Sequence, residues 1–532
     1  MIRVMSNSSE IAGTVASDDR EYPGAHTQTA IARVVIGELE RVLPATARRP
    51  LTAQTSLSAC GIDDVLLGDA VARIEGRYGM RFRAEWLAPV RSCGDLVDCI
   101  AERMFDAADR TADQAAEALP SRSRLVEQRT SPAPATGGVF PECAALEQRL
   151  ADLQAAGLEN PFRLATESVR GRTARIGGRE VVCFTSFDYL GLGSHPDVIR
   201  GAKDAIDRFG CGASASRMVG GNNILLDELD TELAAFMGAE RATVFPCGYG
   251  TNASVFAHLF GREDLILYDE LAHNSIVQGA NASQAATRSF RHNDHDQLDA
   301  LLRDIRGRYR RVVVAIEGVY SMDGDYPDLP RFIEVKQRHD ALLYVDEAHS
   351  IGTMGQNGRG ICEFFDVDPA AGDLWMGTIS KAFGSGGGYL AGNRELIDYL
   401  GLTTPAFVFS TACSPPNAAA ALAAVRVLQR EPERVERLRE RSELFLKLAN
   451  DVGLDTGSSG DTPVIPVILG SSQRALAVSQ QLLELGINAR PILYPAVRES
   501  AARVRFFVTS EHSEEQIVAA VEAVAEVAAA TS

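Results

Sequence analysis

One lysine stands where a buried strand should end and a glycine-rich loop begins. Lys381 lies in the segment MGTISKAFGSGGG, directly after a short apolar run, and the glycines follow it. A lysine shielded from water can lose its proton near neutral pH and act as a nucleophile and then as a base. Most loop lysines are simply solvated, so the rest of the chain has to show that this one does chemistry.

Three further predicted strands end in groups that could work with Lys381. The run LLYVD ends at Asp346 and leads to His349, VVVAIEG carries Glu317, and ATVFPCG ends at Gly248. In open α/β sheets, ligands bind beyond the carboxyl ends of the strands. Any one of these residues taken alone is more simply explained as a helix cap. Taken together, they predict one site along a single sheet edge.

A strand-end lysine opposite a strand-end aspartate suits pyridoxal phosphate. A lysine holds that cofactor as a Schiff base, and an acid keeps its pyridine nitrogen protonated. Its phosphate binds backbone N–H groups at a helix start, which CGYGTNAS can supply, and small hydroxyls, which Thr378 and Ser380 can supply. His273, in LAHNSIVQGA, is a candidate to stack on the cofactor ring.

The segments that have to position these residues follow an α/β pattern over residues 142–532. Apolar runs that predict buried strands alternate with helical stretches; the runs are ATVFPCG, RVVVAIEG, ALLYVDEAH, DLWMGTIS and PAFVFST. This alternation predicts a parallel sheet with helices on both faces. The last stretch, with TPVIPVILG and RVRFFVTS, predicts a smaller C-terminal α+β lobe.

The front of the chain has a different pattern. Residues 1–28 are polar and are predicted to be disordered, and residues 107–141 are rich in Ala, Pro, Ser and Thr and predict a linker. Between them, residues 29–106 carry three stretches with helical apolar spacing, which predict a small all-α helical bundle.

Part of this helical unit, LTAQTSLSACGIDDVLLGDAVARIEGRYGMRF, resembles an acyl carrier protein. Asp64 stands where a carrier has the serine that receives phosphopantetheine. A carboxylate cannot form that phosphodiester by the usual transfer, so we expect a pseudo-carrier domain that is never loaded. It would serve either to dock a partner or acyl donor, or only to help the chain fold and stay in solution.

Composition and charge exclude several classes of protein. The formal net charge of −18 argues against a nucleic-acid binder, which needs a basic face. No segment has the length and apolarity of a signal peptide or a membrane span. The nine cysteines are scattered without metal-ligand spacing. They predict reduced thiols, no metal site and a cytoplasmic location. The GSGGG run lacks the setting of a dinucleotide fingerprint.

Five segments resemble, in the same order, the α-oxoamine synthases; they are FTSFDYLGLGSHPDV, EGVYSMDGD, YVDEAHSIGTMGQNGRG, GTISKAFGSGGGYLAG and FSTACSPP. These pyridoxal-phosphate enzymes have the aspartate-aminotransferase fold, fold type I. The group includes 8-amino-7-oxononanoate synthase and serine palmitoyltransferase. The resemblance covers about residues 142–532.

The resemblance implies a role for each residue of the site. Lys381 would form the Schiff base, Asp346 would pair with the pyridine nitrogen, His349 would lie near the phenolic oxygen, and His273 would stack on the ring. The other cofactor contacts would come from Gly248, Tyr249, Ser321 and Thr378, and from Ser410 and Thr411 of the second subunit of a homodimer. Arg505 would hold the substrate carboxylate, with Arg503 as the alternative.

The implied reaction is a decarboxylating condensation of an α-amino acid with an acyl thioester. The thioester would be acyl-CoA or an acyl chain on a separate acyl carrier protein, and the product an α-amino ketone of secondary metabolism. Two other functions remain open. An aminotransferase on the same fold would share Lys381 and Asp346 but need no thioester, and a non-catalytic docking subunit would need neither residue.

The sequence departs from the family where the substrate is expected. Phe187 replaces an asparagine found in several members, Leu226 replaces a histidine found in many, and LYPAVRESA differs from the PPAVPxG stretch of the family. Arg498, in this last segment, is a candidate contact for a longer or acidic amino-acid side chain. We therefore expect the reaction class to be kept and the amino-acid donor to be unusual.

Overall fold

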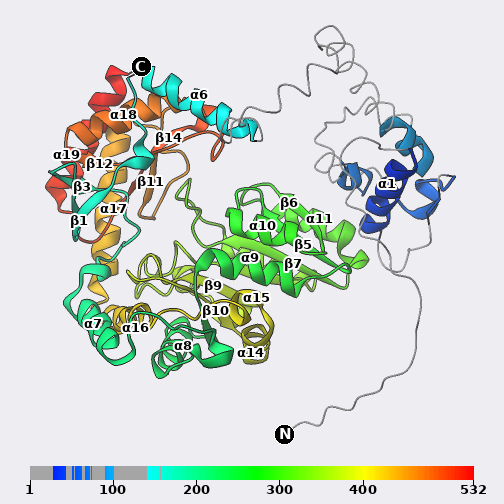
Figure 1. Ribbon diagram of the computed structural model, residues 1–532, viewed down its shortest axis with the longest axis horizontal. Coiled ribbons are helices and arrows are strands. Elements are labelled where there is room, and N and C mark those ends of the chain that lie inside the picture. The colour runs from blue at the N-terminus through cyan, green and yellow to red at the C-terminus, as the bar shows by residue number, and fades with distance from the viewer. Residues whose placement is uncertain are drawn as a thin grey trace, which may run out of the picture. The chain divides into compact units, whose positions relative to one another are not determined.

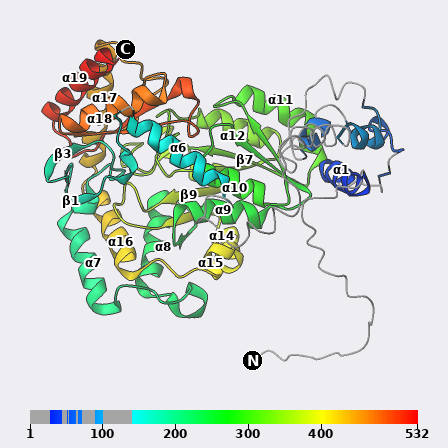
Figure 2. The ribbon, with the colours of Figure 1, turned by 45° about the horizontal axis from the view of Figure 1, so that its top comes forward.

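A computed structural model describes residues 28–43, 51–52, 54–62, 66–71, 74, 90–100, 140–155 and 157–531 (Figures 1 and 2). The chain divides into two compact units, Met1–Gln128 and Arg129–Ser532. Asp64, and all but the last one or two residues of the predicted segments 1–28 and 107–141, lie outside the described residues.

The described part of the first unit is helical around a small apolar core. Helix α1 spans Gln28–Val42, a 3-10 turn spans Ser58–Cys60, and residues 66–71 and 93–100 are also helical. The core includes Leu39, Ala70, Ile74 and Leu96, each with none of its surface exposed. Helical apolar spacing therefore predicted this part of the chain correctly.

The second unit is built on a seven-stranded sheet with the order β4-β10-β9-β8-β7-β5-β6. The strands are β4 (Arg241–Phe245), β5 (Asp264–Asp269), β6 (Ala286–Phe290), β7 (Arg311–Glu317), β8 (Leu342–Asp346), β9 (Leu374–Thr378) and β10 (Gly388–Gly392). Strand β10 runs antiparallel to both β4 and β9, and the neighbouring pairs among β9, β8, β7, β5 and β6 are parallel. Six carboxyl ends therefore meet at one edge.

Two sequence-based expectations about this sheet were wrong. The sheet is mixed, because β10 returns after the Lys381 loop and inserts between β4 and β9. The run PAFVFST forms no strand, since α15 spans Pro405–Val408 instead. Proline at the first turn fits a helix start, and only Phe407 of this helix is buried. An apolar run this short does not distinguish a strand from a helix by itself.

Each face of the sheet is covered by helices, as the near-continuous apolar strands predicted (Figure 1). On β7, Val312, Val314 and Ile316 join one core, and Val313 and Ala315 join the other. Such alternation is the period of two of a strand buried on both sides. The first core contains residues of α8 (Ile224–Met237), α11 (His295–Ile305), α12 (Leu329–Arg338), α13 (Ile361–Phe364) and α16 (Pro415–Arg430). The second contains residues of α9 (Gly248–Leu259), α10 (Asn274–Ala282), α14 (Arg394–Thr403) and α15.

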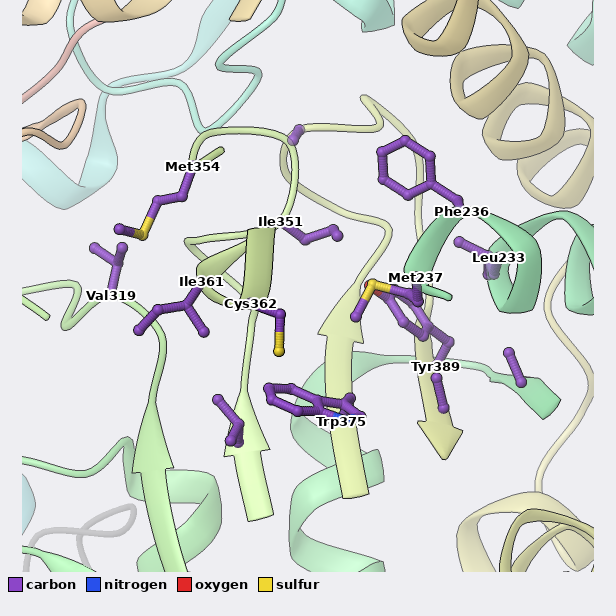
Figure 3. Close-up of a cluster of buried hydrophobic side chains, with 14 of the residues drawn as sticks. Leu233, Phe236, Met237, Val319, Ile351, Met354, Ile361, Cys362, Trp375 and Tyr389 are labelled. Carbon is purple, nitrogen blue, oxygen red and sulfur yellow. The ribbon is translucent and has the colours of Figure 1, made fainter. Parts of the chain in front are cut away.

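Large side chains fill the first core beside the strands that lead to Lys381. Figure 3 shows Met237 of α8 next to Tyr389 of β10, with Trp375 of β9 beside them. The Tyr389 hydroxyl donates to the Met237 sulfur at 3.5 Å, and the Trp375 Nε1 donates to the carbonyl of Pro369 at 3.0 Å. These contacts fix β9 and β10, the two strands that hold the Lys381 loop.

The smaller lobe is assembled from both ends of the second unit. Its three-stranded sheet has the order β11-β14-β13, with β11 at Val464–Ile468, β13 at Arg490–Ile492 and β14 at Arg503–Phe507. A second sheet joins β1 (Thr166–Arg170), β2 (Thr173–Ile176) and β3 (Arg179–Cys183) to β12 (Ile487–Asn488). The helices are α6 (Pro141–Ala155), α17 (Glu433–Asp451), α18 (Ser472–Glu484) and α19 (Glu514–Ala530). Helix α7 (Pro196–Phe209) packs on α16.

Candidate active site

Lys381 lies in a tight loop between β9 and β10. The Gly384 N–H donates to the Lys381 carbonyl at 2.8 Å, and the Ile379 N–H donates to the Gly387 carbonyl at 3.0 Å. Gly384 has a φ of +58°, and a Cβ there would lie 2.2 Å from the Gly193 nitrogen. The glycine-rich loop is therefore a close-packed turn that presents Lys381.

The side chain of Lys381 is partly buried. Burial lowers its pKa to about 8, and the carboxyls of Asp346 and Glu317 partly offset this effect. The Arg505 guanidinium lowers the pKa further. A lysine with this pKa carries a useful fraction of free amine at neutral pH, which both a nucleophile and a base require.

Asp346 ends β8 as a buried carboxylate whose hydrogen-bond partners are neutral. Its Oδ2 accepts from Asn252 Nδ2 at 2.7 Å, and its Oδ1 accepts from the Ala348 N–H at 2.9 Å. Only 4% of Asp346 is exposed, and among the described residues no cationic side chain forms an ion pair with it. A buried carboxylate is costly without a cation. The site therefore fits a cationic ligand group such as a protonated pyridine nitrogen.

Asn252 is a site residue that the sequence analysis missed. Besides its bond to Asp346, its Nδ2 donates to Ser275 Oγ at 2.9 Å, and its Oδ1 accepts from the Tyr344 hydroxyl at 2.6 Å. It lies one turn into α9, after the predicted phosphate-binding turn. An amide in a helix has no pattern of its own, so only the fold shows that it holds Asp346.

Two histidines lie beside this carboxylate and lysine. His349 is buried and shares a hydrogen bond of 2.7 Å between its Nδ1 and the Tyr189 hydroxyl. Burial, then Lys381, holds the pKa of His349 well below its usual range, so the ring is neutral. His273 caps α10, and its pKa is also lowered by burial. Its backbone N–H donates to Glu317, and its side chain is only partly desolvated, because the residue as a whole stays exposed.

The start of α9 meets the end of β9, as a phosphate cradle requires. A Cβ on Gly248 would lie 3.0 Å from Thr378 Oγ1, and one on Gly388 would lie 2.7 Å from the Gly248 Cα. This close approach leaves the first N–H groups of a helix at the sheet edge. The Thr378 hydroxyl donates to the Gly387 carbonyl at 2.9 Å, so it would have to turn to donate to a phosphate.

The two candidate arginines of β14 differ in how fully they are paired. The guanidinium of Arg503 donates to the Met322 carbonyl at 2.8 Å and to Asp323 Oδ1 at 2.7 Å, and the residue is buried rather than on the surface. Arg505 Nη1 donates to the Ser321 carbonyl at 2.5 Å, but its buried Nε has no partner. Burial lowers the pKa of Arg505 to about 10. Among the described residues Arg503 has a carboxylate partner and Arg505 has none, so the charge of Arg505 is the one left for a ligand.

Aromatic rings form a wall next to Lys381 and Arg505. The Phe187 ring lies 5.9 Å from Lys381 Nζ and 4.7 Å from the Phe507 ring, and Arg505 lies over Phe507 at 4.4 Å. Leu226, by contrast, is fully buried in the large core. Of these two residues, which are two of the three departures from the family pattern, only Phe187 therefore faces the site within one chain.

Three predicted residues do not meet the lysine in one chain. Ser410 and Thr411 follow α15 at the surface, and among the described residues no recorded contact joins them to Lys381 or Gly248. Ser321 contacts Arg505 through its backbone carbonyl.

No helix of the described part of the chain could cross a membrane, and no cluster of three or more metal-ligating side chains occurs there. All nine cysteines are free.

Comparison with known proteins identifies the family. The family model of class I and II aminotransferases matches residues 179–524. The chain is 39% identical over 382 residues to 8-amino-7-oxononanoate synthase of Symbiobacterium thermophilum, which covers 72% of this chain and 97% of the relative.

The comparison with solved structures agrees with this family. The serine palmitoyltransferase of Sphingomonas wittichii superposes with a TM-score of 0.70 at 31% identity and covers 75% of this chain and 99% of its own. A structure described as SPT with a PLP internal aldimine has a TM-score of 0.70 at 29% identity and covers the same shares. This chain therefore belongs to the class I and II aminotransferase family, and within it to the α-oxoamine synthases, the pyridoxal-phosphate-dependent acyltransferases that condense an amino acid with an acyl thioester and release CO2.

Proposed function

We propose that Lys381, Asp346, His273, His349 and Arg505 carry the reaction of this chain. The observation that supports this assignment most strongly is the pair formed by a buried carboxylate with only neutral partners and a nearby lysine whose pKa is about 8. In an ion pair with a purely structural role, the charges of the carboxylate and the lysine would compensate each other. Here the carboxyl group has no ion-pair partner among the described residues, and the lowered pKa of the lysine gives it a fraction of free amine.

Each residue then has a definite task. When bound, pyridoxal phosphate supplies an electron sink for the carbanion formed at the α-carbon of the amino acid. Asp346 provides the negative charge opposite the ring nitrogen, and Asn252 fixes the orientation of that carboxylate. The free Lys381 amine accepts the α-proton. Neutral His349, held by Tyr189, is a hydrogen-bond partner that adds no charge.

The amino-acid carboxylate is assigned to Arg505. Its buried Nε has no partner, while Arg503 is already held by an ion pair with Asp323 and by bonds to backbone carbonyls. The Phe187 and Phe507 rings make its surroundings less polar, which strengthens a charged contact. We propose that the Phe187 ring limits the amino-acid donor to those whose side chains can pack against an aromatic ring. Arg498 is exposed on the 493–499 loop, and nothing in the fold supports it as a substrate contact.

A homodimer would complete the phosphate site. Phe409 is 84% exposed and directly precedes Ser410 and Thr411, and Val219 is also 84% exposed, with Met218 half-exposed beside it. Apolar patches of this kind mark protein interfaces. The Ala412 N–H donates to the Ala215 carbonyl at 2.9 Å, which brings both segments to one surface. We therefore propose that Ser410 and Thr411 serve the partner's site.

The domain organisation stays a proposal: a pseudo-carrier domain at 29–106, a linker at 107–141 and the synthase domain at 142–532. The cores of the two described units support separate folding. We propose that the pseudo-carrier domain docks the acyl donor, which is acyl-CoA or a separate acyl carrier protein. A role in secondary metabolism stays a prediction.

The first test is the absorbance spectrum of the purified protein with pyridoxal phosphate, before and after each common amino acid. We expect an absorbance band of the Schiff base between Lys381 and the cofactor, and we expect one amino acid to shift it. Lys381→Ala should abolish the band, whereas Lys203→Ala, on exposed α7, should not change it. The condensation is then measured as CO2 released with that amino acid and an acyl thioester. A band that persists in Lys381→Ala would refute the assignment, and turnover without thioester would favour the aminotransferase alternative.

A further inference from the structure

A histidine outside the proposed catalytic set lies between two carboxylates. The Nδ1 of His292 lies 2.9 Å from Asp269 Oδ1, and its Nε2 lies 2.9 Å from Asp325 Oδ2. Because a carboxylate only accepts, both ring nitrogens donate and the ring is an imidazolium. Burial by itself would lower the pKa of His292, but the two carboxylates raise it to about 10. The edge-on ring of Tyr320, 4.5 Å away, fixes its plane.

The first carboxylate belongs to the sheet edge of the site. Asp269 ends β5 and has none of its surface exposed. Its Oδ1 also accepts from the Leu271 N–H at 2.9 Å, which shapes the turn that leads to His273. Its Oδ2 accepts from the N–H of Asn293, a non-glycine residue with a φ of +54°. Asparagine tolerates this left-handed conformation, and the bond ties the residue after His292 to the same carboxylate.

The second carboxylate is the side chain of Asp325, the last residue of the loop 320–325 that contacts the two arginines of β14. The carbonyl of Asp325 accepts from the Tyr320 N–H at 2.9 Å, and the Gly324 N–H donates to the Tyr320 carbonyl at 2.8 Å. Within this closed loop, the Ser321 carbonyl accepts from Arg505. Ser458, from the smaller lobe, donates to Asp325 Oδ2 at 2.9 Å. The loop 320–325 thus lies between the sheet and the strand that carries Arg505.

We propose that His292 is a positioning residue: by bridging Asp269 and Asp325 it holds the 320–325 loop against the sheet, so that the Ser321 carbonyl keeps Arg505 aimed at the amino-acid carboxylate. This inference rests on the proposed role of Arg505. His292 contacts neither substrate nor cofactor. Its loss should weaken amino-acid binding more than it slows the later steps.

The chain offers a matched control for this experiment. His339 lies 2.9 Å from Asp299 Oδ1 and is also largely buried, but it follows α12, away from the loop 320–325 and Arg505. His292→Phe and His339→Phe each remove a buried imidazole from a carboxylate and keep a flat ring. Asp325→Asn is a milder variant that removes one negative charge from the bridge and keeps its shape.

The experiment uses the full chain loaded with pyridoxal phosphate. Melting temperature and the cofactor band are recorded for each variant, and the band is titrated with the amino acid that shifts it most in a panel of the common amino acids. We expect His292→Phe, or Asp325→Asn if the former does not fold, to raise the dissociation constant about tenfold or more. KM should rise with it, and kcat at saturation should change less. His339→Phe should change the dissociation constant less than about twofold at a similar loss of melting temperature.

Three outcomes would overturn the proposal. The first is a dissociation constant that His292→Phe and Asp325→Asn leave within about twofold of the parent. The second is loss of the cofactor band in these variants, which would mean that they disturb cofactor binding near His273 rather than amino-acid binding at Arg505. The third is an Arg505→Lys variant that binds the amino acid normally. That result would refute the proposed role of Arg505 as well, whereas the first outcome leaves that role intact.

Discussion

The free amine of Lys381 gives a prediction that needs no substrate. The ordinary lysine pKa is 10.5, and burial lowers that of Lys381 to about 8. Only the neutral amine attacks the aldehyde of pyridoxal phosphate. At pH 7 an amine with a pKa of about 8 is about one-eleventh neutral, and one with the ordinary pKa about one part in 3,000, so the ratio is roughly 300-fold.

The perturbation is a change of pH during cofactor loading of the protein stripped of cofactor. Loading is followed by stopped-flow absorbance from about pH 6.5 to 10.5, above the phosphate titration of the cofactor. A blocked lysine in solution serves as the reference amine, because it shares every titration of the cofactor itself. The protein's rate constant should rise with pH and level off above about pH 8. The reference should keep rising toward its own pKa.

The direction of the effect can also be tested by mutation. The Asp346 carboxylate raises the pKa of Lys381 because it favours the ammonium form. Asp346→Asn should therefore move the midpoint of the loading profile to lower pH, whatever it does to turnover. If loading by the parent protein rises in parallel with the reference up to pH 10.5, the amine has an ordinary pKa and the reasoning about its burial is refuted.

Three further predictions concern stability and assembly. Gly279→Ala would place a Cβ 2.8 Å from the Ala253 carbonyl where α9 and α10 pack, so it should cost about 1–3 kcal/mol of unfolding free energy in urea titration, and a smaller loss would show that the two helices can separate. Asp264, fully buried, accepts from the guanidinium of Arg311, and these contacts outweigh burial and lower the carboxyl's pKa. Its stabilisation is present above the unfolded pKa and is lost as pH falls through the folded one. The difference in melting temperature between the parent and Asp264→Asn should therefore stay constant from pH 7 to about 4 and shrink only below that. A difference that shrinks at higher pH would contradict the lowered pKa of Asp264. Phe409→Asp should convert the proposed dimer to monomers in sedimentation equilibrium, and an unchanged mass would exclude this patch as the interface.

The sequence by itself determined four of the seven strands and most of what meets at the edge of the sheet. Apolar runs of strand length located β4, β7, β8 and β9, because strands buried on both faces have few polar positions. The rule that parallel strands end at one edge then brought Asp346 and Lys381 together. The same kind of run misled at PAFVFST, where a proline start and one buried ring suffice for a short helix.

Only the tertiary structure decided which polar groups are paired and which are free. Arg503 and Arg505 are two positions apart on one strand, and the sequence left their roles open. The fold gives Arg503 an ion pair with Asp323 and leaves the Arg505 Nε without a partner. Asn252 and His292 carried no motif of their own, because an amide in a helix and a histidine after a strand acquire their roles from side chains far away in the chain. Hydrogen-bond pairing is a property of three-dimensional neighbours, and local sequence does not encode it.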